Sequence, residues 1–278
     1  MKNSCFALAY CKVAYRKVLS NCLQPTLAVG LIALTCASSH PLHAQAPREL
    51  HIAAASDLQP VLPTLAAAYE HATGIKIIAS FGSSATLTQQ IINGDPQDLF
   101  LSADYVHPEQ LVAANLTTSN IPTPYAHGVL VLWARHDSPA QPLTLNSLTS
   151  PNVTKIAIAN GMHAPYGLAA GKALQSLGLT DKLAPKLVVA EDIAQTAQFA
   201  ESGNAQAALI SLTIASSPRF RELGTFVRFP PTSYAQIRQC AVILKSSKNQ
   251  AAAQDFLNWL TSSAIQQNLT KFGLDPVQ

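Results

Sequence analysis

Short apolar runs alternate with amphipathic stretches along the chain from residue 50 onward. An apolar run followed by apolar residues at helical spacing is typical of a strand joined to the next parallel strand by a crossover helix. The pattern therefore predicts an α/β fold with mixed, mostly parallel sheets. The predicted strands are residues 50–54, 75–79, 99–102, 128–133, 155–159, 187–189, 207–210 and 239–244, and the predicted helices are residues 58–72, 85–93, 167–177, 194–201 and 251–262.

Glycine and proline positions support the first two predicted helices. Gly74 and Gly94 each stand just beyond one of them, where a glycine commonly ends a helix. Pro60 and Pro63 fall inside the first turns of the first helix, where a missing backbone N–H costs little. These residues therefore agree with the helix boundaries that the apolar pattern predicts.

Two changes in composition divide the chain after the first three predicted strands. The segment 122–127 precedes a strongly apolar strand that leads into a second lobe. Pro230 and Pro231 mark the way back, since consecutive prolines cannot continue a sheet ladder. We therefore predict that residues 47–127 and 230–278 form lobe 1 and that residues 128–229 form lobe 2.

The N-terminal residues have the composition of a targeting segment. A basic stretch precedes the apolar run 27–34, which is too short to span a bilayer, and small residues then lead to Ala44-Gln45-Ala46. We predict that residues 1–46 are a signal peptide and that the mature protein is periplasmic. A retained membrane anchor and lipid attachment at Cys36 are the alternatives, although Leu34-Thr35 makes a poor lipobox.

Charge and cysteine content both change once this segment is set aside. Four of the 18 basic residues and none of the 15 acidic ones lie in residues 1–46, so the remainder carries 14 basic and 15 acidic side chains, a net charge of −1. A nearly neutral chain gives no electrostatic reason to expect a nucleic-acid partner. Of the five cysteines only Cys240 remains, inside a predicted buried strand, so the mature chain has no internal disulfide.

Four predicted strand–turn–helix junctions carry small or polar residues, at positions 55–57, 82–86, 164–167 and 191–193. In an open parallel sheet such turns lie at the carboxyl ends of the strands, where ligands bind. Each helix start presents unpaired N–H groups and the positive end of the helix dipole. Several starts facing one cleft therefore form an anion site that needs no lysine or arginine.

Individual side chains at these junctions have two interpretations. Ser56 and Ser84 either cap their helices or donate a hydroxyl to a ligand. Tyr166 either packs in the core or contacts the ligand, and Ile193 offers only its backbone N–H. The prediction of an anion site therefore rests on their joint placement.

The segments around these junctions resemble the periplasmic molybdate-binding proteins of ABC importers. The resemblance extends in order and spacing over essentially the whole mature chain. The segments that carry it are 53–58 (AAASDL), 80–87 (SFGSSATL), 94–104 (GDPQDLFLSAD), 164–170 (APYGLAA), 183–187 (LAPKL) and 190–193 (AEDI).

This resemblance implies the type II periplasmic binding-protein fold, with two Rossmann-like α/β lobes and a ligand cleft between them. It also implies a monomeric binding protein, not an enzyme, that takes up molybdate and tungstate, needs no cofactor and passes the ligand to a membrane permease. Ser56 and Ser84 would bind the oxyanion from lobe 1, and Tyr166 and Ile193 from lobe 2. These residues would contact molybdenum only as its oxyanion.

Two positions depart from the family pattern. Some members have a ligand-binding tyrosine where this chain has Ser211, and others rely on a tyrosine at the position of Tyr166. Asp57 stands where an uncharged residue is usual, and a carboxylate directed at a dianion would weaken binding. A carboxylate at this position is tolerable if it faces outward and complements the helix dipole instead, and the sequence leaves open whether Asp57 faces the ligand.

Other potentially reactive residues show no catalytic or metal-binding spacing. Asp95, Asp98 and Asp104 match no calcium loop, and we expect them in turns and helix caps. The histidines contain no H-x-x-x-H pair, and His163 near the predicted cleft is not assigned to the ligand. Neither a nucleophile elbow nor a phosphate-binding loop is present.

Two other functions stay open on the residues alone, a binding protein for sulfate or an organic acid and an exported hydrolase. A carboxylate ligand would normally meet an arginine, and none flanks the four junctions. A pocket made only of donors favours a fully ionised anion, because the proton of hydrogen phosphate would have no acceptor.

Overall fold

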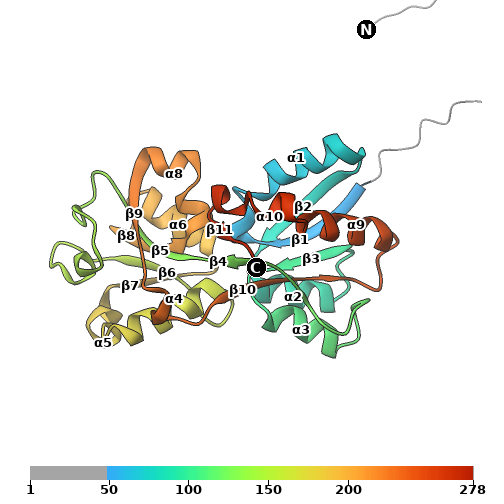
Figure 1. Cartoon of the computed structure of the whole chain (residues 1–278). Coiled ribbons are helices and arrows are strands. Elements are labelled where there is room, and N and C mark those ends of the chain that lie inside the picture. The colour runs from blue at the N-terminus through green and yellow to red at the C-terminus, as the bar shows by residue number, and fades with distance from the viewer. Residues whose placement is uncertain (1–48, 278) are drawn as a thin grey trace, which may run out of the picture. The chain divides into compact units, whose positions relative to one another are not determined.

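The computed structural model describes residues 49–277, which form two α/β lobes, each built on one sheet (Figure 1). The predicted signal peptide, residues 1–46 with Cys36, lies outside the described residues. Among the helices between residues 49 and 277, none combines the length and the apolar character needed to cross a membrane.

Lobe 1 contains a six-stranded sheet in the order β11-β4-β10-β3-β1-β2. Its strands are β1 (Glu49–Ala55), β2 (Lys76–Gly82), β3 (Leu99–Ser102), β4 (Thr123–Gly128), β10 (Ile237–Ile243) and β11 (Leu274–Asp275). Its helices are the 3-10 turn η1 (Ser56–Leu58), α1 (Leu62–Thr73), α2 (Ser84–Ile92), α3 (Val106–Ala113), α9 (Gln250–Leu260), α10 (Ser263–Gln266) and the 3-10 turn η5 (Leu269–Phe272). In Figure 1, α1 lies above this sheet, whereas α2 and α3 lie below it.

Lobe 2 contains a five-stranded sheet in the order β7-β6-β8-β5-β9. Its strands are β5 (Leu130–Arg135), β6 (Ile156–Ala159), β7 (Leu187–Ala190), β8 (Ala207–Ser211) and β9 (Gly224–Arg228). Its helices are η2 (Leu145–Thr149), α4 (Pro165–Ser176), α5 (Thr180–Leu183), η3 (Ala184–Lys186), α6 (Ile193–Glu201), α7 (Leu212–Ala215) and α8 (Pro218–Leu223). Helices α6 and α8 lie above the sheet and α4 and α5 below it (Figure 1).

Both sheets are mixed, as predicted, but they are less parallel than predicted. Parallel pairing is confined to β2-β1-β3 in lobe 1 and to β7-β6-β8 in lobe 2. The remaining pairings are antiparallel. Strand β4 runs directly into β5, and β9 returns to β10 through the 3-10 turn η4 (Pro231–Ser233). These connecting strands carry the chain between the lobes, and η4 lies at the proline pair that was expected to mark the return.

The predicted helix 58–72 is wrong at its start. Residues Ser56–Leu58 form a separate 3-10 turn, and the α-helix begins only at Leu62, with Pro63 in its first turn. Gly74 ends this helix in the left-handed conformation at φ 71°, as a glycine at that position should. Helix α2 ends at the C-cap Asn93, and Gly94 follows it in the left-handed region at φ 95°.

Strand β4 was missed by the sequence analysis. It contains Pro124, which cannot donate a ladder hydrogen bond and therefore argues against a central strand. The pairing between β10 and β4 shifts register between Gln239 and Cys240, which lie opposite Ala126 and Pro124. This register shift accommodates Pro124 in the strand. Cys240 is fully buried in β10, as predicted.

Candidate functional site

The four predicted junctions converge on one small pocket between the lobes, and Ser56, Ser84, Tyr166 and Ile193 all contribute to its wall. Its volume is about 10 Å³, room for about one water molecule. Neither a lysine nor an arginine is among the described residues that line it. The lining residues are Ala55, Ser56, Asp57, Gly82, Ser83, Ser84, Ala103, Ala164, Pro165, Tyr166, Asp192 and Ile193.

Ser84 is the first residue of α2 and is 1% exposed. Its hydroxyl oxygen accepts from the N–H of Ala103 at 3.1 Å, which orients the side chain. The preceding residue Ser83 caps the helix by accepting from the N–H of Thr86. The capping interpretation of Ser84 is therefore wrong, and the hydroxyl proton of Ser84 has no acceptor among residues 49–277.

Ser56 does not cap a helix either. The residue before η1 makes no side-chain cap, and the hydroxyl of Ser56 donates to Oδ2 of Asp192 at 2.8 Å. Asp192 belongs to lobe 2, where its Oδ1 caps α6 by accepting from the N–H of Gln195 at 2.8 Å. In this structure the hydroxyl of Ser56 therefore donates its hydrogen bond to a carboxylate of the opposite lobe.

Lobe 2 presents two helix starts to the pocket. Ile193 is the first residue of α6, and Tyr166 is the second residue of α4 after Pro165. The N–H groups of a first helical turn have no acceptor within their own helix, so both residues can offer one to a ligand. Tyr166 is 1% exposed, and its phenol hydroxyl forms a hydrogen bond with Asp57.

Asp57 forms a buried cluster with Tyr166 and Gln239. The Tyr166 hydroxyl donates to Asp57 Oδ2 at 3.1 Å, and Gln239 Nε2 donates to the same oxygen at 2.5 Å and to the tyrosine oxygen at 3.2 Å. Asp57 is completely buried, and its Oδ1 has no hydrogen-bond partner in the described part of the chain. Asp57 therefore does not face outward but lies buried in the pocket lining, which the sequence had left open.

Burial changes the acid–base properties of this cluster. Loss of solvation raises the pKa of Asp57 from 3.8 to about 7, against the lowering effect of the hydrogen bonds from Gln239 and Tyr166. Burial also raises the pKa of Tyr166 well above its ordinary value, and the nearby Asp57 adds to this effect. The tyrosine is therefore a donor at physiological pH, whereas Asp57 changes its charge there.

The sequence suggested a pocket made only of hydrogen-bond donors. The structure differs, because the pocket also contains acceptors. The carboxyl groups of Asp57 and Asp192 both belong to its lining. Asp192 is held by Ser56 and by the start of α6, so its negative charge lies at the positive end of a helix dipole. Asp57 instead accepts hydrogen bonds from the side chains of Tyr166 and Gln239.

Ser211 and His163 lie outside the pocket lining. Ser211 is buried at the start of α7, where its hydroxyl pairs with that of Thr213 at 2.7 Å. The ring of His163 is paired with Glu191 at 2.9 Å on the surface of lobe 2. Its carbonyl accepts from the N–H of Ala85 at 3.2 Å, a further hydrogen bond between the lobes.

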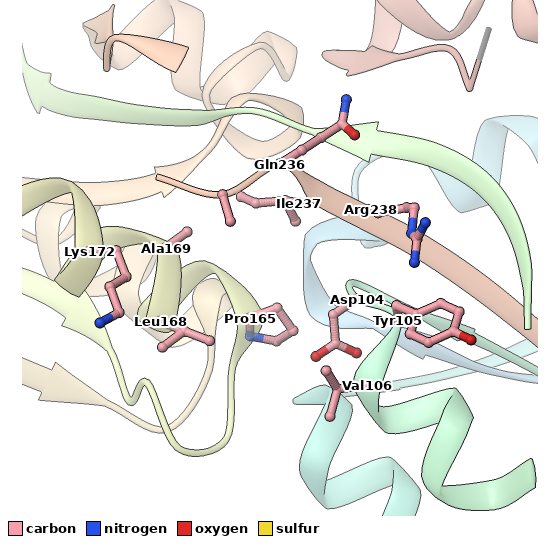
Figure 2. Close-up of a pocket in the computed structure, with 11 residues that line it drawn as sticks. Asp104, Tyr105, Val106, Pro165, Leu168, Ala169, Lys172, Gln236, Ile237 and Arg238 are labelled. Atoms are coloured by element: carbon pink, nitrogen blue, oxygen red, sulfur yellow. The ribbon is translucent and has the colours of Figure 1, made fainter. Parts of the chain in front are cut away.

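A wider groove of about 450 Å³ continues from the pocket along the boundary between the lobes (Figure 2). Pro165 lines both spaces. In Figure 2, Lys172 lies on the lobe 2 side of the groove and Asp104 on the lobe 1 side. The guanidinium of Arg238 lies 4.5 Å from the ring centre of Tyr105. Lys172 and Arg238 thus line the groove and not the small pocket.

The remaining acidic candidates have structural partners. Asp98 accepts from the N–H of His51 at 2.8 Å and from the hydroxyl of Ser247 at 2.6 Å. Asp104 accepts from the N–H of His107 at 3.1 Å, next to the start of α3. Within residues 49–277 no group of three or more acidic, histidine or cysteine side chains is placed to hold a metal ion.

Comparison with known proteins agrees with this architecture. Residues 50–275 match the family described as bacterial extracellular solute-binding protein. The molybdate-binding protein ModA of Azotobacter vinelandii is 34% identical over 248 residues, covering 89% of this chain and 95% of that protein. ModA of Rhodobacter capsulatus is 32% identical, covering 89% and 96%.

Solved structures show the same fold. The periplasmic molybdate-binding protein of Azotobacter vinelandii matches with a TM-score of 0.75 and 31% identity, covering 82% of this chain and 100% of that chain. The sulfate-binding protein SubI of Mycobacterium tuberculosis shares the fold, with a TM-score of 0.71 at 15% identity, covering 83% and 88%. The chain therefore belongs to the bacterial extracellular solute-binding proteins and, among them, to the family of the molybdate-binding proteins ModA.

Proposed function

We propose that this protein captures molybdate outside the cytoplasm and delivers it to the membrane permease of an ABC importer. The observation that carries the proposal is the convergence of the starts of α2, α4 and α6 on one pocket, together with two serine hydroxyls. Such a pocket offers neutral hydrogen-bond donors and the positive ends of helix dipoles, which suit an anion. The relatives with 34% and 32% identity are both named as molybdate-binding proteins.

The proposed ligand contacts come from both lobes. Ser84 contributes its hydroxyl proton, and Ser56 contributes a hydroxyl once Asp192 releases it. Ile193 and Tyr166 contribute backbone N–H groups from the first turns of their helices. Molybdenum would be contacted only through the oxygens of its oxyanion, so these residues are ligands of the anion and not of a metal ion.

Binding requires the lobes to move apart and close again. A pocket of about 10 Å³ is smaller than a tetrahedral oxyanion, which has four oxygens around its central atom. The hydrogen bonds from Ser56 to Asp192 and from Ala85 to His163 join the lobes beside the pocket. We infer that both open when the ligand enters and that the lobes close by a hinge at the connecting strands.

The proposed function also includes the range of ligands, the oligomeric state and the export of the protein. Tungstate should bind as molybdate does, because the two anions have the same charge and nearly the same size. The mature protein should act as a monomer without a cofactor, and removal of residues 1–46 should release it into the periplasm. We propose binding rather than catalysis because the relatives with 34% and 32% identity are both named as binding proteins.

Isothermal titration of the exported, processed protein with molybdate, tungstate, sulfate and phosphate tests the proposal. We expect tight binding of molybdate and tungstate and weak binding of sulfate and phosphate. Strong heat with sulfate and none with molybdate would overturn the choice of ligand.

A further inference from the structure

Asp57 is the unusual group in this anion site. It lines the pocket, it is completely buried, and only one of its two oxygens is used. Oδ2 accepts from both Tyr166 and Gln239, whereas Oδ1 has no partner among the described residues. A buried polar atom without a partner is costly and marks a place where a ligand or a proton is expected.

A charged Asp57 is incompatible with a dianion in the same pocket. Two negative groups at close range in a medium of low polarity repel strongly, and within residues 49–277 no lysine or arginine lines the pocket to offset the repulsion. Ionised, Asp57 could only accept hydrogen bonds, so its free oxygen would face the oxygens of the anion without a proton between them. Neutral, it gains one O–H donor.

The position of that proton follows from the existing hydrogen bonds. Oδ2 already receives hydrogens from the Tyr166 hydroxyl and the Gln239 amide. An added proton therefore belongs on Oδ1, and the hydrogen-bond acceptor that it needs is an oxygen of the ligand. The Asp57 side chain would then complete the ring of donors.

We propose that Asp57 is a specificity-determining residue that binds the oxyanion as a neutral carboxylic acid, donating from Oδ1–H to one anion oxygen. The inference rests on the proposed function, since it requires an oxyanion in this pocket. The balance is simple: one proton from solvent forms the O–H bond on Oδ1, and no other bond is made or broken. At alkaline pH the protein therefore takes up one proton from solvent for each dianion that it binds.

The charged and titratable groups around Asp57 agree with this assignment. From α4 it faces Tyr166, and from β4 it faces the buried Tyr125, whose pKa is raised partly by the charge of Asp57. From β10 it faces the uncharged amide of Gln239. Across the pocket, Asp192 adds a further negative group through Ser56. All of these neighbours are neutral donors or negative, so none stabilises a charged Asp57 as a cation would.

The expected pH range follows from the acidity of Asp57. Its pKa with the lobes closed and no ligand bound is about 7, because burial removes its solvation, and a dianion beside it raises the pKa further. Below about pH 7 the carboxyl is already neutral, and affinity is constant. Above that value a proton must be taken up on binding, so the association constant for molybdate falls about tenfold per pH unit.

Calorimetric titration of the exported, processed protein with sodium molybdate tests the inference. Measurements run from about pH 6 to about pH 9, on both sides of the Asp57 value, at constant ionic strength. Pairs of buffers with different ionisation enthalpies report the number of protons taken up per molybdate bound. We expect uptake to approach about one proton at the alkaline end, with the tenfold decline per pH unit.

Asp57→Asn is the informative variant, because its amide imitates the neutral acid. Its oxygen can accept from Tyr166 and Gln239, and its NH₂ group can donate to the anion. We expect no proton uptake, no pH slope, and affinity at about pH 9 at least tenfold above that of the unaltered protein. Asp255→Asn, on the exposed face of α9, is the matched control and should behave as the unaltered protein.

The outcomes separate this inference from the proposed function. Molybdate binding without proton uptake, or a pH slope that survives in Asp57→Asn, would overturn the role of Asp57 and leave molybdate capture standing. Absence of molybdate binding at every pH would overturn the proposed function itself. Should Asp57→Asn not fold, the proton count of the unaltered protein decides the question alone.

Discussion

The hydroxyl of Tyr166 in lobe 2 donates to the carboxyl of Asp57 in lobe 1 at 3.1 Å, so the two lobes meet through a buried hydrogen bond beside the ligand pocket. The tyrosine approaches so closely that Gly128 has no room for a side chain, since a Cβ there would collide with the hydroxyl. The contact thus depends on the strand that carries the chain from one lobe to the other.

Tyr166→Phe should weaken both folding and binding. Loss of the donor leaves Asp57 with Gln239 alone, which should lower the free energy of unfolding by about 1–3 kcal/mol. Closed lobes also lose one connecting hydrogen bond, which should reduce molybdate affinity about two- to tenfold. Denaturant unfolding and calorimetry measure the two effects. Tyr125→Phe, whose hydroxyl donates to Ser102 within lobe 1, should affect only stability, and equal affinity losses in both variants would contradict this role.

Ser84→Ala should weaken molybdate binding about 10- to 100-fold without unfolding the protein. The hydroxyl proton of Ser84 is free for the anion, and a hydrogen bond to a charged group contributes about 1.5–3 kcal/mol. Stability should fall by about 1–3 kcal/mol, because the N–H of Ala103 loses its buried acceptor. Calorimetry and circular dichroism check both points. Ser211→Ala, outside the pocket lining, is the control, and unchanged affinity in Ser84→Ala would remove this residue from the site.

Asp192→Asn should bind molybdate up to about tenfold more tightly. Asparagine caps a helix as well as aspartate does, so α6 keeps its start. The substitution removes a negative charge from the pocket lining, and one unit charge near a bound anion is worth about 1 kcal/mol or more. Titration at one fixed pH measures the change. Weaker binding in this variant would show that Asp192 assists the ligand through Ser56 rather than competing with it.

The stability of the ligand-free protein should fall as pH rises from about 4 to about 7. Asp57 has a folded-state pKa of about 7 against 3.8 for the free side chain, so the folded state holds the proton more firmly across this range. Its stabilising contribution is complete below the unfolded pKa and is lost as pH passes through the folded value, up to about 4 kcal/mol. Denaturant unfolding at several pH values measures this loss.

The same experiment on Asp57→Asn isolates the contribution of this residue. The variant cannot ionise at position 57, so its stability should lack the decline that begins near pH 4 and should exceed that of the unaltered protein near pH 8. A decline of equal size in both proteins would assign the pH dependence to other groups.

Local pattern determined many of the elements, though not β4, and the positions of the four junctions. The strand at 99–102 was predicted with its observed bounds, and Gly74 was predicted to end a helix and does so at φ 71°. These features depend on near neighbours in the chain: alternation of apolar positions, and the steric freedom of glycine at positive φ. The junctions at Ser56, Ser84, Tyr166 and Ile193 follow from the same signals, because a turn between a strand and a helix is a local event.

Tertiary structure alone decided what these residues do. Asp57 meets Tyr166 across 109 positions of sequence and Gln239 across 182, and no local signal contains that pairing. Ser56 was interpreted as a cap or a ligand donor, yet it bonds to Asp192 of the other lobe. The sequence therefore determined an α/β protein with several helix starts available to an anion. Only tertiary packing, with Gln239 of lobe 1 and Tyr166 of lobe 2 beside it, removed Asp57 from water, and that desolvation turns an ordinary acidic side chain into a group that titrates near neutral pH.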